Sequence, residues 1–183
     1  MSRTTNQGIV IWVTGLAGSG KTTVASILTD RLSTHTKASV LDGDVIRKIL
    51  GKSNSNFDSS SRLEVAQKIC EYTLASAKKN ALTIVATISL FEQVHQWKQK
   101  YLQQHYDLLL DVPIKLLIKR DKNGLYSQHL SGQQAGVVGM DLDPEYPQNP
   151  KWKILNTGSM QELVKLCTPI AEELKLMLSS DQQ

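Results

Sequence analysis

The sequence lacks the features that mark secreted, metal-rich and membrane-spanning proteins. It has only two cysteines in 183 residues. Because Cys70 and Cys167 lie far apart, each among helix-like apolar neighbours, we expect small core residues rather than a disulfide or a metal pair. No apolar run approaches the length of a membrane span. Residues 1–7 are too polar for a signal peptide, so we expect a cytoplasmic protein without a membrane partner.

A strong charge of either sign is missing as well. Lysine and arginine total 21 against 17 acidic residues, a net charge of +4 at pH 7, and no dense Lys/Arg run is present. We therefore expect no nucleic-acid partner, although a mild basic excess suits an anionic ligand. Hydrophobic residues make up 40% of the chain, which is typical of a globular protein. The length suits one well-buried domain, which we expect to span residues 1–183.

What the sequence does have is a glycine-rich phosphate-binding motif. Residues 15–22, GLAGSGKT, match G-x-x-x-x-G-K-[ST] at every fixed position and follow an apolar run at residues 9–13. A strand, a glycine turn and a helix in this order aim backbone N–H groups and the positive end of a helix dipole at phosphate oxygens. Lys21 can then reach the β- and γ-phosphates, while the Thr22 hydroxyl can hold Mg²⁺.

Two acidic residues follow the next predicted strand, at residues 38–41. Asp42 and Asp44 lie beyond the carboxyl end of this strand, where ligands bind in an open α/β sheet. Asp44 can accept a proton from an acceptor hydroxyl or hold Mg²⁺, and Arg47 can hold an anionic acceptor. For Asp42, a helix cap is an equally good interpretation. The sequence has no N-K-x-D motif, which a GTPase of the familiar type needs, so small-molecule phosphoryl transfer is favoured.

Hydrophobic periodicity predicts that strands and helices alternate along the rest of the chain. We expect further strands at residues 81–88, 107–112 and 153–155, and helices from residue 21 to about 33–36, from 63 to about 78–80, over 91–104, from 114 and from 160. This alternation predicts a parallel sheet with right-handed crossovers in a single α/β domain. Pro169 should kink or divide the last helix.

Two stretches are rich in polar and turn-forming residues and lack a clear period. We expect residues 49–61 to form a loop or a short broken helix. Residues 120–150 carry four glycines and three prolines in mostly polar surroundings. Because so long a loop inside a compact domain is usually functional, we expect a mobile lid there.

Six segments resemble, in order and spacing, those of the adenylyl-sulfate kinase family. They are GLAGSGKTT, LDGDVIR, FDSSSR, TISLF, RDKNGLY and GMDLDPEYPQNP, and the resemblance covers residues 9–158. It implies the P-loop NTPase fold of nucleoside monophosphate kinases, with a five-stranded parallel sheet flanked by helices and a lid at about residues 121–150. It also implies a homodimer that uses ATP and Mg²⁺ to phosphorylate the ribose 3′-hydroxyl of a small nucleotide, adenylyl sulfate.

The same resemblance implies roles for individual residues. Lys21 and Asp44 would be catalytic, and Thr22 and Asp44 would hold the metal. ATP would contact Arg120 and the phosphate loop, whose binding residues would be Gly15, Ala17, Gly18, Ser19, Gly20, Lys21, Thr22 and Thr23. The acceptor nucleotide would contact Asp42, Asp44, Arg47, Phe57, Arg62, Ser89, Gly124, Leu125, Tyr126, Val137 and Asp141.

Departures from the family pattern are concentrated in the acceptor half. Val65 and Gln67 stand where the family has an asparagine and an arginine beside the acceptor's anionic group. Val137 stands where a second aromatic residue would stack on the acceptor base. In the lid, basic residues of the family are replaced by Asn123, Gln128 and Leu130.

The motifs leave three interpretations open. The chain is a diverged adenylyl-sulfate kinase with compensating contacts, or a kinase whose acceptor is another nucleotide with a small diphosphate-like anion. The second type resembles cytidine diphosphoramidate kinase of capsule decoration, whose smaller pyrimidine needs less stacking surface. The third is a nucleotide-binding regulator or pseudokinase that binds ATP without transfer. The retention of Asp44, Arg47 and Ser89 argues against the third.

Overall fold

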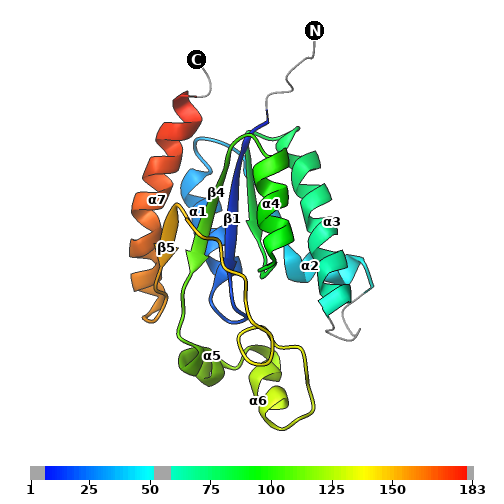
Figure 1. Cartoon of the computed structure of the whole chain (residues 1–183). Coiled ribbons are helices and arrows are strands. Elements are labelled where there is room, and N and C mark those ends of the chain that lie inside the picture. Colours follow the sequence, from blue (N-terminus) through cyan, green and yellow to red (C-terminus); the bar gives the residue numbers. More distant parts are fainter. Residues whose placement is uncertain (1–6, 52–58, 181–183) are drawn as a thin grey trace.

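A parallel five-stranded sheet forms the centre of the molecule (Figure 1). The computed structural model describes residues 7–51 and 59–180. In this part of the chain the strand order is β2-β3-β1-β4-β5, and every neighbouring pair is parallel. The strands are β1 (Ile9–Gly15), β2 (Ser39–Asp42), β3 (Leu82–Ala86), β4 (His105–Leu110) and β5 (Trp152–Ile154). The predicted α/β fold with a five-stranded parallel sheet is therefore confirmed.

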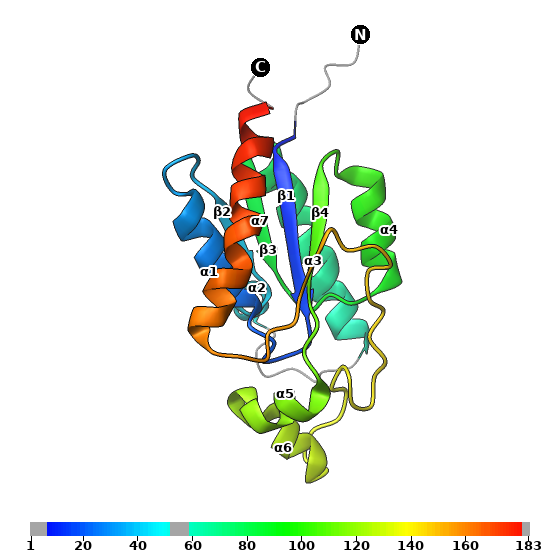
Figure 2. The same cartoon turned by 90° about the vertical axis from the view of Figure 1, so that its left-hand side faces the viewer.

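Helices cover both faces of the sheet (Figure 2). One face is covered by α1 (Lys21–Leu32) and α7 (Met160–Ser180). The other face is covered by α2 (Gly43–Ile49), α3 (Ser59–Ala77) and α4 (Glu92–Tyr101). Beyond the carboxyl ends of the strands lie α5 (Ile114–Arg120), the 3₁₀ turn η1 (Lys122–Gly124) and α6 (Leu125–Leu130).

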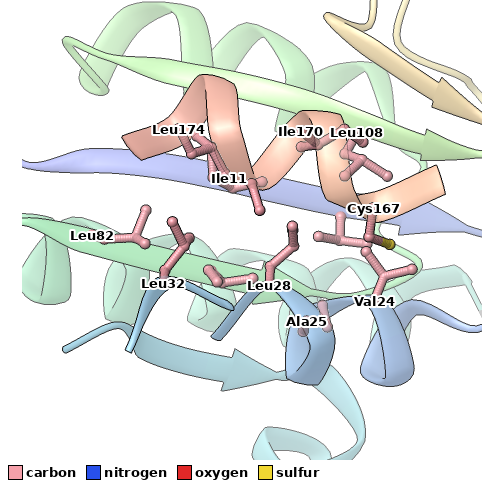
Figure 3. Close-up of a cluster of buried hydrophobic side chains, with 14 of the residues drawn as sticks. Ile11, Val24, Ala25, Leu28, Leu32, Leu82, Leu108, Cys167, Ile170 and Leu174 are labelled. Carbon is pink, nitrogen blue, oxygen red and sulfur yellow. The ribbon is translucent and has the colours of Figure 1, made fainter. Parts of the chain in front are cut away.

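The core is built on both sides of β1. Because successive side chains of a strand point to opposite faces, Ile11 packs with Leu28 and Cys167 beneath α1 and α7 (Figure 3). Trp12 packs with Cys70 on the side of α3 and α4. Both cysteines are buried and free, which confirms their predicted role as core residues.

Three sequence predictions about individual segments need correction. The sequence predicts that Pro169 kinks or divides the final helix; the helix continues through Pro169 as one element, so it is not divided there. Residues 120–150 are not one loop, because η1 and α6 lie inside this segment. The helix expected from residue 63 begins at Ser59. In the described ranges, 7–51 and 59–180, no helix is long and apolar enough to cross a membrane.

The sheet register brings the predicted site residues to one edge. Asp42 at the end of β2 pairs with Ala86 of β3, and Ala86 pairs with Val13 of β1. The carboxyl ends of three adjacent strands are therefore level. Three segments leave the sheet at this end: the phosphate loop, the acidic turn after β2 and the segment after β3. They face α5 and α6, which lie beyond the same end of the sheet.

Candidate active site

The phosphate loop joins β1 to α1 in the strand, turn and helix order that the motif predicts. The Lys21 ammonium folds back over the loop and donates hydrogen bonds to the carbonyl oxygens of Gly15, at 2.9 Å, and Leu16, at 2.8 Å. Burial of this ammonium group, together with the charge of Lys122, lowers the pKa of Lys21 to about 8. A desolvated cation held by two neutral carbonyls can be drawn to a phosphate anion, which would offer a charged acceptor.

Asn156, which follows β5, holds the phosphate loop from outside. Its side-chain amide donates to the Ser19 carbonyl at 2.8 Å. Gly20, before α1, has φ 102°, and a Cβ there would come within 2.6 Å of the Asn156 amide nitrogen. Glycine at this position is therefore required by backbone conformation and by space. Sequence reasoning missed Asn156, whose only signal is its place just beyond the carboxyl end of a strand.

Contacts from α5 and α6 hold the rim of the phosphate loop. Arg120 donates to the Gly18 carbonyl at 3.3 Å and to the Asn156 carbonyl at 2.8 Å. The Tyr126 hydroxyl donates to the Ala17 carbonyl at 2.8 Å, and the Tyr126 side chain is fully buried. The base of the predicted lid is thus attached to the phosphate loop.

The acidic turn after β2 performs two structural tasks. Asp42 is the N-cap of α2, and one carboxylate oxygen accepts hydrogen bonds from the backbone N–H of Asp44, at 2.8 Å, and Val45, at 3.4 Å. The other oxygen accepts from the Thr22 hydroxyl at 2.7 Å. The cap interpretation of Asp42 is therefore confirmed. Gly43 lies so close to β3 that a Cβ would come within 2.7 Å of the Thr87 hydroxyl.

Asp44 faces a group of cations. Its carboxylate lies 2.8 Å from the ammonium of Lys122 in η1. Burial alone would raise the pKa of the Asp44 carboxyl, but the hydrogen bond and charge of Lys122, with the charges of Lys21 and Arg47, bring it below its ordinary value. The carboxylate is therefore ionised near neutral pH and able to accept a proton from a bound hydroxyl.

A single cavity of about 710 Å³ connects the phosphate loop, the acidic turn, α3, the segment after β3 and the lid. A cavity of this size is ample for small-molecule ligands. Most of the predicted site residues line it. These are Ala17, Gly18, Gly20, Lys21, Thr22, Thr23, Asp42, Asp44, Arg47, Arg62, Ser89, Arg120, Leu125 and Val137.

Other predicted site residues lie outside the cavity lining. Tyr126 is buried behind the phosphate loop, and Asp141 accepts hydrogen bonds from the backbone N–H groups of Gly136 and Val137. Tyr126 and Asp141 therefore stabilise the lid through hydrogen bonds and do not line the cavity. Gly15, Ser19 and Gly124 are likewise absent from the described lining. Phe57 lies outside the described residues.

The wall of the cavity away from the phosphate loop carries two guanidinium groups. Burial lowers the pKa of Arg62, and the nearby charge of Arg47 lowers it further, so the two side chains face the same region. Arg62 also donates to the Gly136 carbonyl of the lid. Ser89, with φ 23°, shares a hydrogen bond of 2.9 Å with Thr87. Strained positions of this kind cluster at ligand sites.

The replaced residues divide into two groups. Val65 and Val137 are buried and line the cavity, so both give it an aliphatic wall. Gln67 is exposed and is absent from the described lining. Gln67 therefore forms no part of the described cavity wall.

The fold and this site define a P-loop kinase, with a phosphate loop and an acidic turn opening into one cavity. The sequence profile described as Adenylylsulphate kinase matches residues 7–155. The chain belongs to the adenylyl-sulfate kinase family, whose members use ATP as a substrate.

Similar proteins include enzymes named for two different acceptors. The chain is 35% identical over 144 residues to cytidine diphosphoramidate kinase of Campylobacter jejuni, covering 78% of this chain and 84% of that protein. It is 34% identical over 150 residues to a probable adenylyl-sulfate kinase of Pyrococcus abyssi, covering 81% and 85%. The structure of the APS kinase CysC of Mycobacterium tuberculosis with AMPPNP and APS is similar at a TM-score of 0.77 and 26% identity, covering 91% of this chain and 98% of that one.

Proposed function

We propose that the protein transfers the γ-phosphoryl group of ATP to the ribose 3′-hydroxyl of a pyrimidine nucleotide carrying a diphosphate-like anion, of the cytidine diphosphoramidate type. The observation that carries this proposal is the single cavity in which the phosphate loop, the Asp44 carboxylate and the Arg47–Arg62 wall open onto the same space. A donor, a proton acceptor and a second anion site are the parts that phosphoryl transfer between two nucleotides needs.

In this proposal, the phosphate loop and Lys21 hold the triphosphate. The acceptor hydroxyl gives its proton to the Asp44 carboxylate while its oxygen bonds to the γ-phosphorus. The bond from that phosphorus to the β–γ bridging oxygen breaks, and ADP leaves. Arg47 and Arg62 bind the acceptor's anionic group and so fix its hydroxyl in line. Lys21 balances charge on the bridging and terminal oxygens.

Mg²⁺ is part of the proposal, and the residues present suit it. The Thr22 hydroxyl and the Asp42 carboxylate are in contact, and Asp44 lies two residues further along. The described residues contain no cluster of three or more His, Cys, Asp or Glu side chains that would hold a metal alone. This agrees with Mg²⁺, which usually takes one or two carboxylates together with phosphate oxygens and water. When bound, the ion neutralises phosphate charge.

The choice of acceptor rests on the walls of the cavity. A purine stacked between two aromatic rings gains about 1–3 kcal/mol from each face. Val137 removes one such face, and Val65 offers the anionic group an apolar contact in place of an amide. A smaller pyrimidine loses less by the missing ring, which favours the cytidine nucleotide over adenylyl sulfate. We also propose a cytoplasmic homodimer, on family resemblance alone.

The test is an acceptor panel with MgATP, comparing cytidine diphosphoramidate, other cytidine and uridine diphosphate analogues, and adenylyl sulfate. We expect ADP release that depends on the acceptor and is fastest with a cytidine compound. Strong turnover of adenylyl sulfate alone would overturn the acceptor assignment and leave the kinase assignment standing. ATP binding by calorimetry without transfer to any acceptor would favour the pseudokinase interpretation instead.

A further inference from the structure

In the described part of the chain, Lys122 is the one lid residue whose side chain pairs with Asp44. Its ammonium lies 2.8 Å from the Asp44 carboxylate, and the two side chains are 44% and 67% exposed. Exposed ion pairs of this kind contribute little to stability. The position of the pair is more important than its stability. Lys122 contacts the Asp44 carboxylate, which accepts the proton of the acceptor hydroxyl in the proposed mechanism.

The backbone around Lys122 is fixed close to the phosphate loop. Asp121 has φ 36° and Asn123 has φ 58°, so the chain turns sharply on both sides of Lys122. The Asp121 carboxylate holds this turn by accepting from the backbone N–H groups of Tyr126, at 2.8 Å, and Ser127, at 3.1 Å. A Cβ built on Gly18 of the phosphate loop would lie 3.6 Å from the Lys122 Cβ.

Lys122 and Lys21 also face the same space. The charge of Lys122 helps to lower the pKa of Lys21, and both side chains line the cavity. Two ammonium groups that face the same space repel each other. A triphosphate placed on the loop would attract both.

We propose that Lys122 exchanges partners during the reaction: it neutralises Asp44 in the free protein and moves to the triphosphate when ATP binds, which releases Asp44 for the acceptor hydroxyl. This inference rests on the proposed function. A weak, exposed pair on a flexible side chain is easily exchanged for a more highly charged partner. In the free protein, the pairing also reduces repulsion between Asp44 and an approaching nucleotide.

The exchange has a signature in ATP affinity. The groups that face Asp44 are Lys122 from the lid, Lys21 from the phosphate loop and Arg47 from its own helix. If the two side chains separate when ATP binds, their contact is present in the free protein and absent in the complex, so the substitutions Lys122→Met and Asp44→Asn have non-additive effects on ATP affinity. Removing Lys122 should then weaken ATP binding more in the Asp44→Asn protein than in the wild type, because no carboxylate competes there with the triphosphate for the ammonium group.

The experiment compares Lys122→Met with Lys122→Arg and with Lys119→Met, whose lysine is exposed on α5 and absent from the described cavity lining. For Lys122→Met we expect kcat/KM for ATP to fall about 10- to 100-fold. We also expect Lys122→Met to weaken ATP binding, measured by calorimetry, by a larger factor in the Asp44→Asn background than in the wild-type background. Lys122→Arg should keep most of the activity, and Lys119→Met should match the wild type.

Two results would overturn the exchange. Equal loss of ATP affinity in the two backgrounds would mean that Lys122 stays on Asp44 throughout, and an unchanged Lys122→Met enzyme would mean that the pair has no part in the reaction. Neither result affects the proposed function, which fails only if the wild-type protein transfers phosphate to no nucleotide acceptor. Thermal melting of each variant checks that the fold is retained.

Discussion

The phosphate end of the cavity is held by contacts to backbone atoms, whereas the acceptor end is formed by side chains. Carbonyl groups of Ala17, Gly18 and Ser19 accept the bonds that fix the phosphate loop. At the other end, Val65 and Val137 face the cavity directly. Substitutions at the acceptor end can therefore change what is bound without changing the fold. The phosphate end tolerates little variation, because its shape depends on backbone conformation.

The largest effect is expected at Asp44, where the two ends meet. Asp44→Asn keeps the size of the side chain but removes its capacity to accept a proton. We expect kcat to fall about 10³-fold, with ATP binding retained. Phosphoryl transfer and calorimetric ATP titration of the same sample measure both quantities. A variant that kept a tenth of the wild-type kcat would remove Asp44 from the role of proton acceptor.

A second substitution tests the phosphate end of the cavity, whose shape depends on backbone conformation. Gly20→Ala combines a positive φ with a close approach to the Asn156 amide. Gly132→Ala is the matched control, because Gly132 has φ 77° and no atom within 4 Å of its built Cβ. We expect Gly20→Ala to lower the free energy of unfolding by about 1–3 kcal/mol more than the control does, measured by urea denaturation. Equal losses would show that the Asn156 contact adds nothing to the strain.

The same contrast explains what the sequence could predict. Residues 9–13 of β1 can be predicted, because this apolar run leads directly into the phosphate motif, and the phosphate loop follows the strand as expected. By contrast, α6 was predicted as part of a loop. Its six residues have little helical periodicity, and its anchor is the bond from Tyr126 to Ala17, 109 residues earlier in the chain.

Side-chain contacts over long sequence distances account for the other site residues that were missed. Asn156 holds Ser19 across 137 residues, and Lys122 holds Asp44 across 78. No local pattern encodes either contact, because each depends on how the sheet edge and the lid are placed in space. Gln67 is on the exposed surface of α3, and its place beside the acceptor's anionic group, which comes from the resemblance, stays a prediction.

The lowered pKa of Lys21, at the phosphate end, predicts that ATP affinity depends on pH. Lys21, with a pKa of about 8, faces Lys122, Asp44 and Asp42. Below pH 8, Lys21 is protonated in the free protein, so affinity should not change with its ionisation. Above pH 8 the free protein loses this proton, and binding of the anionic nucleotide must take it up again. The affinity should therefore fall by up to about tenfold for each pH unit.

Calorimetry in two buffers of different ionisation enthalpy measures this proton uptake directly. Lys21→Arg is the control, because an arginine keeps its charge throughout this range. Its affinity, whatever its value at pH 7, should not change between pH 8 and pH 9. A wild-type affinity that stayed constant over the same interval would contradict the lowered pKa.

The smallest effect is expected from rebuilding the acceptor end. Val137→Phe restores an aromatic face to the cavity wall, and it should raise kcat/KM for adenylyl sulfate relative to the cytidine acceptor by about tenfold, since one stacked face contributes about 1–3 kcal/mol. Val137→Leu is the control, because it adds volume without an aromatic ring. Val137 packs in the buried cluster with Leu16 and Leu117, so each variant also needs a melting curve to detect overpacking. If leucine changed the acceptor preference as much as phenylalanine, then cavity volume rather than stacking would determine the choice of base, and the difference between the two ends would be one of space alone.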